Sequence, residues 1–121
     1  QPTVFADVDD EMLIAKEEIF GPVQSILKWS DVDDVLARAN ASDYGLAAGI
    51  ICDDLHLVNT LSRGLQAGTI WVNTYHVYDH AVPFGGYKMS GIGRDKGADA
   101  LGHYTNTKAV VHKLEGQQKW L

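Results

Sequence analysis

The stretch PFGGYKMSGIGRDKG, at 83–97, combines five glycines with two lysines and one arginine. Glycine-rich backbone can turn several N–H groups toward a phosphate, so this stretch is a candidate phosphate cradle. From Gly91 onward, however, the glycines have the spacing G-x-G-x-x-x-G, which is one residue too long for the dinucleotide-binding fingerprint. No Lys-Ser or Lys-Thr pair follows Gly91, as a P-loop requires. The spacing therefore favours the alternative, a tight scaffold that shapes a pocket for another ligand.

Acidic side chains near the start of the chain have part of the spacing of a calcium-binding loop. Positions 1, 3, 5 and 12 of such a loop would be taken by Asp7, Asp9, Glu11 and Glu18. Position 6, where the loop turns sharply and needs glycine, is Met12. We therefore expect no calcium site in this segment.

The segment HVYDH and the single cysteine are the other candidates for metal binding or nucleophilic chemistry. His76, Asp79 and His80 could meet a metal if the segment were helical, but neither a helical pattern nor a convincing further ligand accompanies them. Cys52 precedes Asp53 and Asp54, whose negative charges disfavour a thiolate. We predict no metal site here, and Cys52 is a poor candidate for a nucleophile.

The composition is that of an ordinary globular domain. The chain has 121 residues, 45% of them hydrophobic and 21% charged, which is enough for one domain with a core. Its net charge of −6 argues against a nucleic-acid partner, and its longest apolar runs are far shorter than the ~20 residues that cross a membrane. One cysteine fits a reducing compartment, so we expect a soluble intracellular protein of the cytoplasm or the mitochondrial matrix. Because the chain starts with Gln1 rather than methionine, we expect a fragment.

The elements that must position these residues alternate between strand and helix. Strands are predicted at 3–6, 23–29, 47–51 and 69–72, and helices at 31–40, 54–65 and 97–103. Ser30 and Asp33 form a capping-box-like start for the first of these helices. The alternation implies right-handed crossovers and a parallel sheet covered on both faces. A last strand is predicted at 108–114, before the polar tail GQQKWL.

Three stretches together resemble the NAD(P)-dependent aldehyde dehydrogenase family. They are KEEIFGPV at 16–23, GTIWVN with PFGGYKMSGIGRDKG at 68–97, and YTNTKAVV at 104–111. They occur in the order and approximate spacing of that family, and ANASDYGLAAGI at 39–50 fits between them. The resemblance covers essentially the whole chain, but it corresponds to about the last quarter of a family member.

The resemblance implies an α/β fold, namely the C-terminal part of a doubly wound, mostly parallel sheet with helices on both faces, followed by a terminal oligomerisation strand. Residues 1–104 would belong to the catalytic domain, and 105–121 would form the strand and tail. The strand from Lys108 to Leu114 would add to a sheet of a neighbouring subunit and give a homodimer or homotetramer. Asn106 stands where many relatives carry glutamate, so one polar contact between subunits is expected to differ.

The resemblance also implies cofactor contacts in the segment EEIFGPV. Glu18 would accept hydrogen bonds from the hydroxyls of the nicotinamide ribose, a role that suits an ionised carboxylate with two acceptor oxygens. Phe20 would pack beside the nicotinamide ring of NAD or NADP. Without the resemblance, a solvated Glu18 and a core Phe20 would be the simpler interpretation.

The substrate pocket that the resemblance implies is aromatic. Tyr78 and Phe84 correspond to positions that line the aldehyde tunnel, and His76 would face the same tunnel, with local packing as the alternative. Asp95 matches an acidic position close to the catalytic centre, although it could equally favour the start of a short helix. Lys88 and Arg94 would tie the glycine-rich stretch to neighbouring segments or subunits rather than hold phosphate.

The family reaction oxidises an aldehyde to a carboxylic acid through a cysteine thioester, with NAD(P)+ as hydride acceptor and a glutamate that activates water. The resemblance places the nucleophile, the base and the cofactor domain upstream of every segment present here, and Cys52 does not match the nucleophile motif. The chain alone is therefore expected to be inactive. Two hypotheses follow: the C-terminal part of a complete aldehyde dehydrogenase, or a short, non-catalytic homologue that acts as a structural or protein-binding subunit.

Overall fold

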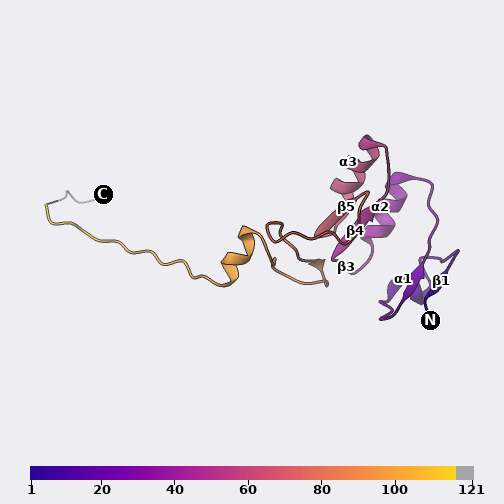
Figure 1. The fold of residues 1–121 in the computed structure, drawn as a ribbon, viewed down its shortest axis with the longest axis horizontal. Coiled ribbons are helices and arrows are strands. Elements are labelled where there is room, and N and C mark those ends of the chain that lie inside the picture. Colours follow the sequence, from indigo (N-terminus) through magenta and orange to yellow (C-terminus); the bar gives the residue numbers. More distant parts are fainter. Residues whose placement is uncertain (117–121) are drawn as a thin grey trace.

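The computed structural model describes residues 1–116, which form short strands and helices along an elongated chain (Figure 1). The elements are, in order, β1 (Thr3–Phe5), α1 (Leu13–Lys16), β2 (Val23–Ser25), α2 (Val32–Asn40), β3 (Tyr44–Gly45), β4 (Ala47–Ile50), α3 (Leu55–Gly64), β5 (Thr69–Val72), β6 (Tyr87–Lys88) and a 3₁₀ helix (Ala98–His103). Every strand and helix predicted from the sequence up to residue 103 has a counterpart here, and α1, β3 and β6 are additional.

The strands pair two by two. β1 and β2 are parallel, as are β4 and β5, whereas β3 and β6 are antiparallel. The prediction of parallel pairing is confirmed for the first two pairs, but the expected single, doubly wound sheet is not formed within residues 1–116. Each strand has only one neighbour in this part of the chain, so the strands that would join the pairs into one sheet are not among them.

The two longer helices are fixed at their ends by side chains. The carboxylate of Asp31 accepts a hydrogen bond from the N–H of Asp34 (2.9 Å), so Asp31 is the N-cap of α2 and the predicted cap at Ser30 was one residue early. At the other end of α2, the amide of Asn40 donates to the carbonyl of Gly64 and accepts from the N–H of Gln66, each at 2.8 Å. Asn40 therefore joins the C-terminal ends of α2 and α3.

Arg38 connects the N-terminal strand pair to α2. Its guanidinium donates to the carboxylate of Asp10 (2.6 Å), to Asp34 (3.2 Å) and to the carbonyl of Lys28 (3.0 Å). The hydrogen bonds to Asp10 and Asp34 raise the pKa of Arg38 above its ordinary value. The guanidinium of Arg38 thus links α2 to two segments that precede it in the chain, at Asp10 and at Lys28.

The core is small for a chain of this length. Four apolar side chains are buried among the described residues: Val8, Ile50, Val58 and Trp71. The chain exposes 10204 Å² of accessible surface, whereas a compact monomer of 13.2 kDa exposes about 6,400 Å². Large apolar side chains such as Phe20 and Ile92 lie almost fully in solvent. No helix within residues 1–116 is both long and apolar enough to span a bilayer.

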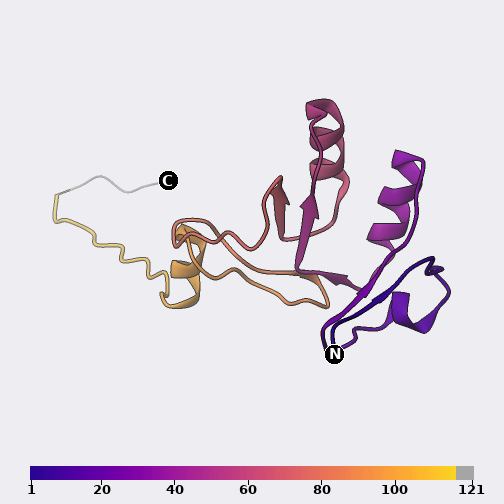
Figure 2. The same ribbon diagram turned by 45° about the vertical axis from the view of Figure 1, so that its right-hand side comes forward.

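The predicted strand from Lys108 to Leu114 does not form in this chain. Figures 1 and 2 show the segment that follows the 3₁₀ helix running away from the strands as an extended trace. Its residues are exposed and make no ladder with another strand up to residue 116. A β-strand is defined by a hydrogen-bonded neighbour, and none is available here. The rest of the predicted tail, 117–121, lies outside the described residues.

Candidate functional site

The glycine-rich stretch is closed at its base by its own backbone. Phe84 and Asp95 exchange two N–H···O=C hydrogen bonds of 2.7 Å each, so residues 84–95 form a loop with paired ends. The base of this loop lies directly against the start of β5. A Cβ atom added at Gly68 would lie 1.7 Å from the carbonyl oxygen of Gly85, which only glycine permits.

Two cations of this loop bind carbonyl groups. The ammonium of Lys88 donates to the carbonyls of Asn40 (2.7 Å), the last residue of α2, and Ser42 (2.9 Å), just beyond the helix. Arg94 donates to two carbonyls of the loop itself (2.7 and 3.0 Å) and lies 5.3 Å from the ring centroid of Tyr87. The expectation that these two cations tie the loop to neighbouring segments is confirmed for Lys88, whereas the guanidinium of Arg94 forms its hydrogen bonds within the loop.

Aromatic rings gather between the end of β5 and the base of the loop. The ring of Tyr78 lies 5.9 Å from His76 and 5.3 Å from Phe84, measured between centroids. Trp71 and Tyr75 complete the group, with Trp71 centred 5.4 Å from Tyr78. The three residues predicted for the substrate pocket are therefore brought together. We call these five side chains the aromatic cluster.

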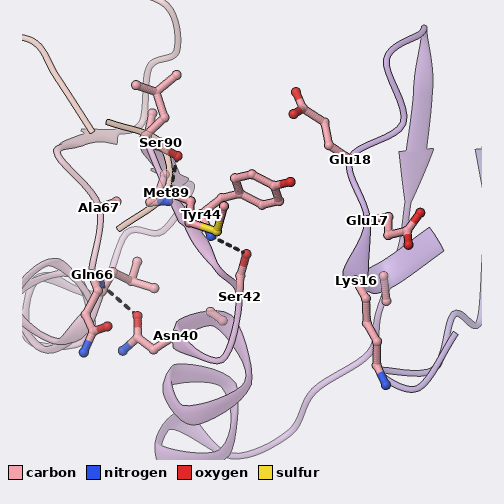
Figure 3. Close-up of a pocket in the computed structure, with 17 residues that line it drawn as sticks. Lys16, Glu17, Glu18, Asn40, Ser42, Tyr44, Gln66, Ala67, Met89 and Ser90 are labelled. Carbon is pink, nitrogen blue, oxygen red and sulfur yellow. Dashed lines mark hydrogen bonds between the residues drawn. The ribbon is translucent and has the colours of Figure 1, made fainter. Parts of the chain in front are cut away.

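A cavity of about 640 Å³ opens between the segment after α1 and the strands β3 and β4 (Figure 3). Lys16, Glu17 and Glu18 line one side of it. Tyr44 lines the opposite side, and Figure 3 shows its ring projecting across the opening toward the segment of Glu18. The carboxylate of Glu18 is exposed, and no hydrogen bond or ion pair engages it within residues 1–116. Its acceptor oxygens are thus available to a ligand.

A second cavity, of about 410 Å³, lies inside the glycine-rich loop. Phe84 and Asp95 line it together with His103, the last residue of the 3₁₀ helix, and Tyr104. Leu46 and Ser90 line both cavities, so the wall between them is shared. The predicted cofactor residue Glu18 therefore lines a cavity next to the one lined by Phe84, a predicted pocket residue, and Asp95, which was predicted to lie near the catalytic centre.

The remaining predicted cofactor residue, Phe20, lines neither cavity and is 98% exposed. Sequence reasoning missed the shared wall, which depends on Leu46 and Ser90. The hydroxyl of Ser90 accepts a hydrogen bond from the N–H of Gly45 (2.9 Å), and this contact seats the loop on β3. No spacing rule links residues 45 positions apart, so the sequence carried no signal for it.

The other candidate ligands and nucleophiles have ordinary partners. Asp7 pairs with Lys28, and no three His, Cys, Asp or Glu side chains within the described part of the chain come together as a metal site. Cys52 accepts a hydrogen bond at sulfur from the N–H of Asp54 (3.3 Å), and its backbone pairs with the side chain of Asn73. The backbone of Cys52 thus connects the segment after β4 to Asn73, which follows β5.

Comparison with known proteins gives a consistent match. Residues 1–110 match the aldehyde dehydrogenase family. The chain is 58% identical over 121 residues to the mitochondrial benzaldehyde dehydrogenase of Antirrhinum majus, of which it covers 22%. It is 57% identical over 114 residues to the mitochondrial aldehyde dehydrogenase of Homo sapiens, and again 22% of that protein is covered. The chain thus spans less than a quarter of the length of these relatives.

Solved structures show the same similarity. An indole-3-acetaldehyde dehydrogenase of P. syringae in complex with NAD+ superposes with a TM-score of 0.88 at 44% identity, over 93% of this chain and 23% of that one. An NAD+ complex of an aldehyde dehydrogenase of Mycobacterium tuberculosis gives a TM-score of 0.87 at 44% identity, over 98% and 24% of the two chains. The short strands and helices described above therefore have the arrangement of one part of these enzymes.

Proposed function

Because this chain belongs to the aldehyde dehydrogenase family, we propose that it forms one wall of a site that oxidises an aldehyde to a carboxylic acid with NAD+ or NADP+. The chain spans about 22% of its relatives, so the nucleophilic cysteine and the general base are assigned to sequence outside it. The observation that carries the proposal is the carboxylate of Glu18, which no other side chain within residues 1–116 engages, on a cavity that adjoins the one lined by Phe84 and Asp95.

The residues present fit a dinucleotide. The exposed Glu18 offers two acceptor oxygens to a ribose diol, and charge-assisted hydrogen bonds of this kind are about twice as strong as neutral ones. Phe20 has an almost fully exposed ring that could cover one face of a planar heterocycle. When bound, the nicotinamide ring supplies the acceptor for the hydride of the substrate. The role of these two residues is to bind and orient that ring.

The aromatic cluster is the proposed binding surface for the body of the aldehyde. Apolar and aromatic walls with a few polar groups are typical of small-molecule sites, and His76, Tyr78 and Phe84 form such a wall. Asp95 is tied to Phe84 through the backbone pair at the base of the loop. We propose that this pair holds Asp95 beside the reacting carbonyl, where its carboxylate helps to orient the catalytic groups.

The open surface supports completion by further polypeptide. The chain exposes about 3,800 Å² more than a compact monomer of its mass, whereas a standard interface covers about 800 Å² on each partner. We propose that residues 1–104 complete a doubly wound sheet with the remainder of the catalytic domain. The segment 105–121 would then add a strand, from Lys108 to Leu114, to a neighbouring subunit of a homodimer or homotetramer. Two similar proteins are named as mitochondrial, which supports a location in the mitochondrial matrix or the cytoplasm.

The test is a charge-removing substitution in the complete chain that carries this segment. Glu18→Gln keeps the size of the side chain but loses the charge, so the KM for NAD+ is expected to rise by about tenfold. Glu11→Gln, at a position that lines neither cavity, is the matched control and should leave this KM within about twofold, a change of under 0.5 kcal/mol. Equal effects of the two substitutions would contradict the assignment of Glu18.

The 121-residue chain provides the second arm of the test. We expect it to form no NADH from NAD+ and a simple aldehyde such as propanal, because it lacks the nucleophile. Turnover by this chain alone that disappears on Cys52→Ala would overturn the proposed division of roles.

A further inference from the structure

The cation of Lys96 lies on the aromatic cluster. Its ammonium is 4.7 Å from the ring centroid of Tyr78 and 5.8 Å from that of Phe84, within the range of cation–π attraction. Lys96 has a φ of 61°, in the left-handed region that a side chain rarely adopts without support from its surroundings. No ion pair engages this ammonium within residues 1–116. The rings are therefore its partners.

Aromatic faces that are free attract organic cations, and quaternary ammonium groups are bound in this way. The side chain of Tyr78 is 47% exposed, so its ring is accessible to a ligand. Lys96 already occupies the place over both rings where such a ligand cation would bind. A cationic aldehyde would be repelled by the like charge of Lys96 and would lose the attraction of the ring faces to it, whereas a neutral aldehyde of the same shape would meet neither penalty.

We propose that Lys96 is a specificity-determining residue that makes the pocket reject aldehydes bearing a quaternary ammonium group. The inference rests on the proposed function, because it takes the aromatic cluster as the aldehyde-binding surface. Lys96 acts as an internal competitor for the ring faces of Tyr78 and Phe84. Its removal therefore frees these faces and removes the repulsion at once.

The kinetic test uses two aldehydes of nearly the same shape, trimethylammonioacetaldehyde and 3,3-dimethylbutanal, with the complete chain that carries this segment. The measured quantity is the ratio of kcat/KM for the cationic aldehyde to that for the neutral one. Lys96→Met is expected to raise this ratio about tenfold. Lys96→Arg should keep it near the wild-type value because it keeps the charge. Lys28→Met is the matched control, since Lys28 pairs with Asp7 and contacts neither ring.

A binding measurement separates this inference from the proposed function. Choline and 3,3-dimethylbutan-1-ol differ in the same way as the two aldehydes and need no catalysis, so their dissociation constants can be compared by calorimetry. Lys96→Met should tighten choline binding about tenfold relative to the neutral alcohol. An unchanged ratio in both experiments, in a variant that melts at the wild-type temperature, would overturn the role of Lys96. The wild-type protein could oxidise neither aldehyde while Lys96→Met still binds choline more tightly. That result would refute the proposed function but support the inferred role of Lys96.

Discussion

The contact between Gly68 and Gly85 gives the sharpest prediction about the loop. A Cβ atom at position 68 would lie 1.7 Å from the carbonyl oxygen of Gly85 and 2.8 Å from its carbonyl carbon. Because Cβ atoms essentially never approach another heavy atom within 3.0 Å, Gly68→Ala must widen the gap by at least 1.3 Å, the difference between 3.0 and 1.7 Å. Both partners are backbone, so no side-chain rotation can relieve the clash.

The displacement reaches the candidate site directly. Gly85 follows Phe84, whose backbone pair with Asp95 closes the loop, so a shift of Gly85 moves both residues. Overpacking of this kind destabilises a protein by about 1–3 kcal/mol. A misplacement of about 1 Å near reacting groups lowers the rate about 100-fold. We therefore expect Gly68→Ala to reduce both stability and kcat/KM for a small aldehyde.

The assay is thermal denaturation together with NADH formation, both in the complete chain. Gly102→Ala is the control, because a Cβ atom added there meets nothing within 4 Å. This control should retain wild-type kcat/KM and a free energy of unfolding within about 1 kcal/mol. If Gly68→Ala retained kcat/KM within threefold of wild type, the close backbone approach would have no role in placing the site.

Two further predictions concern the ends of the helices, and both are measured by chemical denaturation of the complete chain. Asn40→Ala removes two hydrogen bonds that join α2 to α3 and should lower the free energy of unfolding by about 2 kcal/mol, whereas the exposed Asn59→Ala should change it by less than about 0.5 kcal/mol. Equal losses in these two variants would argue against the bridging role of Asn40. Asp54→Ala removes the N-cap of α3, which accepts from two N–H groups, and should cost about 1 kcal/mol, whereas Asp53→Ala should be close to neutral. A larger loss from Asp53→Ala would show that the cap is assigned to the wrong residue.

Local patterns were enough to predict the elements that depend on neighbouring residues. The β-branched and aromatic run at 69–72 is β5, and the apolar stripe at 54–65 contains α3 within one residue at each end. The cap of α2 was misplaced by one residue because Ser30 and Asp31 are both good caps, and only the backbone decides between them.

Pairing between distant segments could not be predicted in the same way. β3 and β6 each have two residues and are separated by more than 40 positions, so no periodic pattern identifies them. The strand from Lys108 to Leu114 has the composition of a strand but lacks a neighbour, which no local pattern can supply. The prediction of a single sheet was wrong for residues 1–116 for the same reason. Such a sheet needs strands that are not among these residues.

The candidate site was predicted through the family resemblance rather than through spacing. Nothing in the segment HVYDH indicates that Tyr78 would lie between His76 and Phe84, and this arrangement depends on how the chain bends after β5. The wall that Leu46 and Ser90 share between the two cavities was not predicted at all, because it depends on how the loop docks on β3.

The central claim is that this chain supplies one wall of a larger oxidoreductase site. The most direct test is the intact mass of the protein isolated from its source through an antibody against this segment. Because this chain of 13.2 kDa covers 22% of the length of its relatives, we expect a polypeptide of about 60 kDa that forms NADH from an aldehyde and NAD+. A species near 13 kDa with no NADH formation would contradict it and would favour a short, non-catalytic subunit.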